Sequence, residues 1–138
     1  MARRKGRIIA FQALYAWDAN GMELDDIFKF EWVSPETKEH MGEESDAFTR
    51  LLISGTIENC AEIDEVIKKH LINWEFERLN KVDLAILRIS VYSLMYQKDI
   101  HPTIIIDEAV DISKEFGTDE SYRFVNAVLD NVRKTLKV

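Results

Sequence analysis

The sequence predicts an all-α protein, a helical bundle of about seven helices. Only 5 of its 138 residues are Gly and only 2 are Pro, so few residues interrupt helices. Helix-forming residues dominate, and apolar side chains recur at the three- and four-residue spacing of an amphipathic helix. Alternation of apolar and polar residues, which half-buried strands require, never lasts long enough to build a sheet. With 46% hydrophobic residues available for a core, residues 1–138 are expected to form one domain.

Two helices and a loop are predicted near the amino end. The first helix spans residues 4–19, with its apolar stripe on one face. Gly21 follows Asn20 and ends this helix, because both residues tolerate the left-handed conformation of helix ends. A short second helix is expected over residues 23–30. The polar segment 32–42 contains Pro35 and is predicted to be a loop.

The middle of the chain predicts three further helices. A helix over residues 45–60 has Gly55 in its interior, which costs about 1 kcal/mol relative to Ala. A close approach by another helix would explain that glycine. The next apolar stripe lies in residues 63–71, and residues 82–96 are apolar on nearly every side. A helix of the latter kind is usually buried in the middle of a domain.

The last two predicted helices complete the seven. Pro102 favours a helix start, because its missing N–H is not needed in the first turn, and this helix runs over residues 103–116. Gly117 ends it. Thr118 is predicted to cap the final helix, whose positive end is complemented by the two acidic residues that follow. Short links between successive helices favour a bundle.

The sequence shows no metal, nucleotide or nucleophile motif, so we expect no cofactor and no enzyme activity. Its three His residues are about thirty residues apart, and the single Cys60 cannot complete a zinc ligand set or an internal disulfide. No glycine-rich phosphate loop and no GxSxG motif occur. A chain with no long apolar run and one cysteine is expected in the reducing cytoplasm, without a membrane segment or signal peptide.

Charge is distributed unevenly along the chain, which has a net charge of −7. Residues 19–66 hold three basic residues against thirteen acids. Residues 1–17 hold no acid, and their first turns carry four basic side chains. This asymmetry indicates two different partners. The basic residues of this N-terminal arm are Arg3, Arg4, Lys5 and Arg7.

The N-terminal arm is open to two interpretations, a solvated tail or a phosphate clamp. Positive charge is mildly unfavourable at a helix N-terminus, which is itself partially positive, so its concentration there favours a functional purpose. Four phosphate contacts on single-stranded RNA would give a log–log salt slope of roughly −2.8. Among the aromatic residues, Tyr15 lies on the apolar stripe and is expected in the core. Tyr122 and Phe124 remain candidates for stacking on bases.

Several blocks of residues follow one another along the chain: RRKGR at residues 3–7, QALYAW at 12–17, VDLAILRISVY at 82–92, IDEAVDISKEFG at 106–117 and SYRFVNAVLD at 121–130. In the order and spacing of these blocks the chain resembles the NusB family of transcription antitermination factors. The resemblance covers essentially the whole sequence.

The resemblance implies an all-α fold of two packed helical subdomains without catalytic activity. It also implies binding to the boxA element of ribosomal RNA transcripts, together with the small-subunit ribosomal protein that doubles as NusE. That complex joins the RNA polymerase elongation complex through other Nus factors, and some family members self-associate, which makes a homodimer possible. The implied RNA contacts are Arg3, Arg4, Lys5, Arg7, Glu120, Ser121 and Phe124, with Lys69 and His70 as further candidates, while Asp83 and Glu77 are implied contacts of the protein partner.

Four positions depart from the family's usual residues: Lys5, Ser93, Asp107 and Ala127. Lys5 keeps the charge of the usual Arg but loses its bidentate phosphate geometry. Ser93 removes a charge near the central helix and puts a detail of partner contact in doubt. Two rival interpretations stay open: a helical domain related to those attached to RNA methyltransferases, and a scaffold that binds only proteins through its acidic surface.

Overall fold

The computed structural model describes the backbone of residues 2–138 and the side chains of residues 4–138. Within this range the chain forms eight α-helices and one 3-10 turn, and no strand. The all-α prediction is therefore confirmed. The helices are α1 (Ala2–Asn20), α2 (Leu24–Ile27), α3 (Pro35–His40), α4 (Glu43–Glu58), α5 (Cys60–Lys69), α6 (Lys81–Tyr96), α7 (Pro102–Phe116) and α8 (Ser121–Leu136), with η1 (Phe76–Arg78) before α6.

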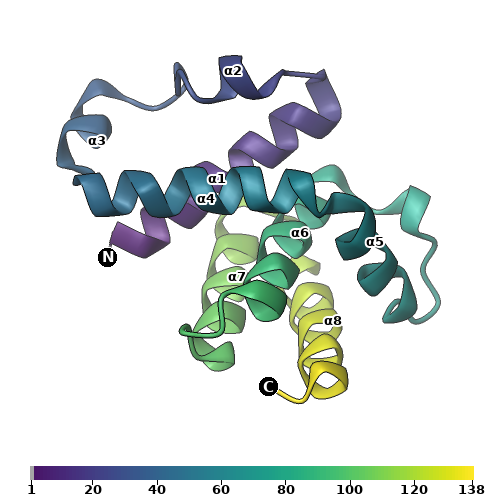
Figure 1. The fold of residues 1–138 in the computed structure, drawn as a ribbon. Coiled ribbons are helices and arrows are strands. Elements are labelled where there is room, and N and C mark those ends of the chain that lie inside the picture. Colours follow the sequence, from purple (N-terminus) through teal and green to yellow (C-terminus); the bar gives the residue numbers. More distant parts are fainter. Residues whose placement is uncertain (1) are drawn as a thin grey trace.

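Helix α6 is the centre of the fold. It packs against α1, α4, α5, α7 and α8, and twelve of its residues are buried. Figure 1 shows α1–α4 on one side of this helix, with α7 and α8 on the other. The Asn80 side chain caps α6 by accepting the backbone N–H of Val82 at 2.7 Å, which fixes where the helix begins. The prediction that this apolar segment is the central helix is confirmed.

Gly55 allows α4 to approach α6 closely, as predicted. A Cβ atom added at this position would collide with the phenol ring of Tyr92. A side chain at this position would have to displace that ring, so the conformational cost of a mid-helix glycine is offset by packing. At the end of α1, Gly21 has a φ of 68°, which is the left-handed conformation predicted there.

Two sequence predictions about local structure are wrong, one about a loop and one about a helix cap. The segment predicted as a loop contains α3, which begins with Pro35 in its first turn and is capped by Ser34, whose hydroxyl accepts the N–H of Thr37. Helix α8 is preceded by Glu120 in place of the expected Thr118. Thr118 instead donates its backbone N–H to the Ser121 hydroxyl at 2.9 Å. The start of α3 and the start of α8 each depend on only a few residues, and the polar residues around both starts have the composition of a loop.

Candidate nucleic-acid interface

Arg4 lies on the surface of α1, where two carboxylates of α7 already hold its guanidinium. One terminal nitrogen is 3.0 Å from Asp111 and the other is 3.6 Å from Glu115. The Arg4 side chain is 35% exposed and both acids are about half exposed. Exposed pairs of this kind contribute at most about 1 kcal/mol and exchange partners readily. Arg4 is therefore accessible to a phosphate, but the phosphate must displace these carboxylates.

Arg7 is buried, and the expectation of a solvent-accessible cation at this position is wrong. Only 2% of Arg7 is exposed, and its Nε lies 2.9 Å from a carboxylate oxygen of Glu108 on α7. A terminal nitrogen donates to the Ser93 hydroxyl of α6 at 3.1 Å, and the guanidinium lies 5.5 Å from the ring centre of Phe48 on α4. Arg7 thus joins four helices. This network positions the first turns of α1 and leaves Arg7 no surface for a phosphate.

Lys5 and Arg3 are the remaining two basic residues of the N-terminal arm. Lys5 is exposed, beside a shallow groove that also contains Gln12 and Trp32. The side chain of Arg3 lies outside the described residues. Among the described side chains of the arm, Lys5 and Arg4 are those that a phosphate can reach. The arm therefore offers less accessible charge than its sequence suggests.

A second surface forms where the segment after α5 meets the beginning of α8. The indole of Trp74 packs against the ring of Phe124, with a centroid distance of 5.5 Å and an angle of 60°. This ring pair lines a groove of about 440 Å³ that includes His70, Glu120 and Arg123. The same two rings also line a smaller groove of about 200 Å³ that includes Glu120 as well. The structure thus brings His70 together with Glu120 and Phe124, which are predicted RNA contacts about fifty residues further along the sequence.

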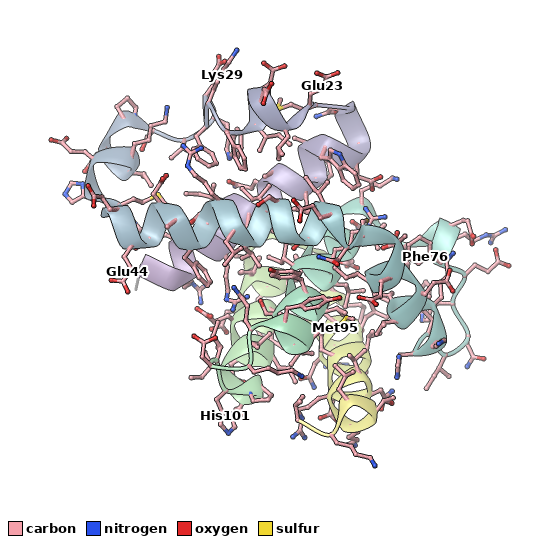
Figure 2. All side chains as sticks on the ribbon, viewed as in Figure 1. Glu23, Lys29, Glu44, Phe76, Met95 and His101 are labelled. Atoms are coloured by element: carbon pink, nitrogen blue, oxygen red, sulfur yellow. The ribbon has the colours of Figure 1, made fainter. Side chains whose placement is uncertain are left out.

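His70 is held in place by hydrogen bonds at both ring nitrogens. Its Nδ1 donates to the Val66 carbonyl oxygen at 2.7 Å, because a carbonyl can only accept. Its Nε2 is hydrogen-bonded to the Thr135 hydroxyl at 2.8 Å. A ligand in the groove would meet the face and edge of this ring, not an unused nitrogen. Lys69, the preceding residue, is exposed. Figure 2 labels Phe76, which marks the neighbouring 3-10 turn η1 beside α5.

Ser121 and Asp83 are buried together at the base of the smaller groove. Ser121 is 1% exposed and Asp83 is 8% exposed. Burial raises the pKa of the Asp83 carboxyl above its ordinary value, and a hydrogen bond from Ser121 opposes part of that rise. The other carboxylate oxygen, Oδ1, is buried without a hydrogen-bond partner. The burial of Ser121 is at odds with a direct RNA contact by this residue. Asp83, predicted as a contact of the protein partner, instead lines the same groove as the predicted RNA contacts Glu120 and Phe124.

Tyr122, near the beginning of α8, also contacts α7. Glu115 of α7 contacts Arg4, and the ammonium of Lys114, the preceding residue, lies 5.1 Å from the ring centre of Tyr122. Arg123 donates to the Tyr122 hydroxyl at 2.9 Å and also lines the larger groove. Tyr122 is thus a half-buried ring that two cations contact.

Two further predictions concern single residues. Tyr15 is 38% exposed, so the expectation that it lies in the core is wrong: it is at the edge of the stripe, in a shallow groove with Phe11 and Val82. Glu77, a predicted protein-partner contact, is exposed in η1. Trp74 was missed altogether, because it belongs to no helical stripe. An isolated Trp among polar residues between two helices was the available signal.

Neither a membrane helix nor a metal cluster is found in the described part of the chain. None of the described helices combines the length and apolar character that a bilayer crossing requires. Among the described residues, no three His, Cys, Asp or Glu side chains gather as metal ligands do. The thiol of Cys60 is half-buried, and burial raises its pKa to about 11, so it is a poor nucleophile.

Comparison with known proteins agrees with this geometry. A family model described as the NusB family matches residues 4–134. The chain belongs to the NusB family. The transcription antitermination protein NusB of Treponema denticola is 54% identical over 134 residues, which cover 96% of each chain. The NusB protein of Bacillus licheniformis is 40% identical over 139 residues, covering 99% of this chain and 100% of its own length.

Solved structures extend the similarity to the fold. NusB of T. maritima is 34% identical with a TM-score of 0.85, over 96% of this chain and 90% of that one. A crystal structure of the antitermination factors NusB and NusE in complex with double-stranded RNA contains a chain that is 29% identical, with a TM-score of 0.85 and 97% coverage of both chains. The relatives are named for antitermination and not for a catalysed reaction, in agreement with the expected absence of enzyme activity.

Proposed function

We propose that this protein is a transcription antitermination factor that binds boxA RNA of ribosomal RNA transcripts together with the ribosomal protein NusE. It then joins the RNA polymerase elongation complex through other Nus factors and supports processive transcription in the cytoplasm. The observation that carries this proposal is the match to NusB proteins over nearly the full length of both chains. The similarity to a chain in a complex of NusB, NusE and RNA supports both partners.

The RNA contacts that we propose fall into two groups. Arg3, Arg4 and Lys5 hold phosphates, whereas Phe124 and Glu120 meet bases at the start of α8. Lys69 adds a phosphate contact beside the larger groove, and His70 presents its ring face. This division is typical of proteins that bind single-stranded RNA, in which cations follow the backbone and rings stack on unpaired bases. Arg7 and Ser121 are retained as residues that position the arm and α8, because both are buried.

Partner selection follows from the charge of the rest of the molecule. Outside the N-terminal arm the chain is strongly acidic, which disfavours nonspecific RNA binding and favours a basic protein. Glu77 is exposed and suits a contact with such a partner. Asp83 is too deeply buried to attract a partner over a distance, so its role with the partner would be short-range, through the rim of the smaller groove.

The alternative is a helical RNA-binding domain related to those attached to RNA methyltransferases. The relatives argue for the first proposal, because they match this chain over 94–100% of their own length and are not larger enzymes. The absence of catalytic activity in the family points the same way.

An electrophoretic mobility shift assay tests the proposed function. Labelled boxA RNA is titrated with the protein alone and with the protein plus the ribosomal protein, and a scrambled RNA of equal length is the control. We expect a preference for boxA RNA that increases when the ribosomal protein is present. Equal affinity for both RNAs under both conditions would exclude the proposal. Binding of the ribosomal protein with no RNA binding would instead support the scaffold that binds only proteins.

A further inference from the structure

Trp74 exposes a large apolar surface on the segment between α5 and α6. Its indole is 59% exposed, and the neighbouring Ile72 is 67% exposed. Large exposed apolar side chains that lie together often mark a binding surface. The segment 70–80 connects α5 to α6 and includes η1, and within it Trp74 packs against Phe124 of α8.

The surroundings of Trp74 fit a base better than an apolar peptide. The larger groove combines apolar walls, including Ala127 and Val128, with polar groups at its rim, including Asn131 and Glu120. Asn131 both donates and accepts hydrogen bonds, and Glu120 accepts them, as the edges of a nucleobase require. The groove volume of about 440 Å³ lies within the range of about 300–1,000 Å³ that is usual for small-molecule sites.

A cation lines each of the two grooves that Trp74 borders. Arg123 lines the larger groove, and Arg78 lines the smaller one. Cations close to an exposed ring are the combination that proteins use to hold single strands, because the cations attract the phosphates while the ring stacks on a base. The groove is also continuous with His70, Glu120 and Phe124, which belong to the proposed RNA surface.

We infer that Trp74 is a base-stacking residue, and that the groove between the segment 70–74 and α8 holds one unpaired base of the bound RNA. The inference rests on the proposed function and adds a residue to it. The indole stacks on the base face, Phe124 packs against the indole and lines the same groove, and Asn131 with Glu120 meets the base edge. The contact is neutral, so it contributes to affinity without releasing counterions.

The test compares Trp74→Leu, Trp74→Phe and the wild-type protein in boxA RNA binding, in the presence of the ribosomal protein and at several salt concentrations. Trp74→Leu removes the ring, and we expect its dissociation constant to rise about 5- to 100-fold, since one base–aromatic stack contributes that much. Trp74→Phe keeps a ring and should retain most of the affinity. The log–log salt slope should be the same for all three proteins. Ile104→Ala, which changes a 52% exposed residue on α7, is the control and should bind as the wild type does.

Tryptophan fluorescence gives an independent measurement. Saturating RNA should quench the emission of the wild-type protein more than that of Trp74→Phe, because a stacked base quenches the indole that it covers. If Trp74→Leu binds boxA RNA with the affinity of the wild-type protein, and RNA quenches its emission as strongly, the inference is overturned and the proposed function stays intact. Weaker binding of the ribosomal protein to Trp74→Leu without RNA would also overturn it, because the groove would then hold protein. No wild-type preference for boxA RNA would remove the proposed function itself.

Discussion

The N-terminal arm and the groove beside α8 offer a ligand very different surfaces. The arm has concentrated positive charge, but α7 supplies carboxylates to Arg4 and Arg7, so much of that charge is already paired. The groove has nearly balanced charge, and its Trp74 ring is exposed and packs on Phe124, which is itself half-buried against the core. A cation in an acidic protein has internal competitors for phosphate, whereas an exposed ring competes only with water. The groove is therefore expected to provide selectivity, and the arm a salt-sensitive part of the affinity.

The largest expected effect concerns Arg7, the buried cation of the N-terminal arm. Arg7→Met leaves the Glu108 carboxylate without its partner in a largely buried position, and we expect a loss of about 3–5 kcal/mol in the free energy of unfolding. Urea denaturation measures it. Arg4→Ala, on the same helix, removes a surface pair and should cost at most about 1 kcal/mol.

The double variant Arg7→Met with Glu108→Leu completes this comparison. Because it removes both buried charges, it should recover a large part of the lost stability. If Arg7→Met is no more destabilising than Arg4→Ala, the described burial of Arg7 is incorrect, and a direct phosphate contact becomes tenable again.

A smaller effect is expected at the base of the groove. The pKa of Asp83 is raised in the folded protein, so the folded state retains a proton that the unfolded chain releases as the pH rises above about 3.8. The ionised carboxylate therefore lowers stability near neutral pH. Asp83→Asn removes this charge and should therefore raise the free energy of unfolding at pH 7, by less than the loss expected for Arg7→Met.

The pH dependence distinguishes this cause from a general packing effect. The gain of Asp83→Asn should shrink as the pH falls through the folded pKa and vanish below about 3.8, where both states are protonated. Thermal denaturation between about pH 3.5 and 7 measures this pH dependence. A gain that is constant across this range would contradict the account. If the variant is more stable but binds RNA or the ribosomal protein less well, Asp83 is retained for function.

The smallest expected effect concerns the accessible charge of the N-terminal arm. Arg4→Ala should flatten the log–log salt slope of RNA binding by about 0.7, the contribution of one phosphate contact on a single strand. The matched variant Asp111→Asn with Glu115→Gln keeps Arg4 and removes its carboxylate partners, so it should strengthen RNA binding severalfold. An unchanged slope in Arg4→Ala would show that the α7 carboxylates retain Arg4 in the complex.

Much of the fold was predictable from the sequence, because its causes are local or periodic. The buried helix over residues 82–96, the glycine that admits Tyr92 and the stop at Gly21 were each visible in the residue pattern. Helix α3 was missed, because its six residues are too few to show a periodic stripe. The placement of Thr118 was missed because Ser121 offers a competing hydroxyl acceptor in the same turn.

The site was less predictable, because pairing across helices cannot be seen in a single run of sequence. Arg4 and Arg7 are three residues apart and look alike, yet Arg4 faces solvent and Arg7 faces the junction of α1, α6 and α7. Their difference depends on which acids of α7 lie opposite each of them. Trp74 acquires a role only through its contact with Phe124, fifty residues later.

Titration of the isotope-labelled protein with boxA RNA, followed by amide NMR, tests the central claim most directly. The account predicts that RNA-induced shift changes concentrate in residues 3–5, in residues 69–78 and at the beginning of α8, and that the indole N–H signal of Trp74 moves with them. Shift changes confined to other surfaces, such as α2 and α3, with these segments unaffected at saturation, would contradict it.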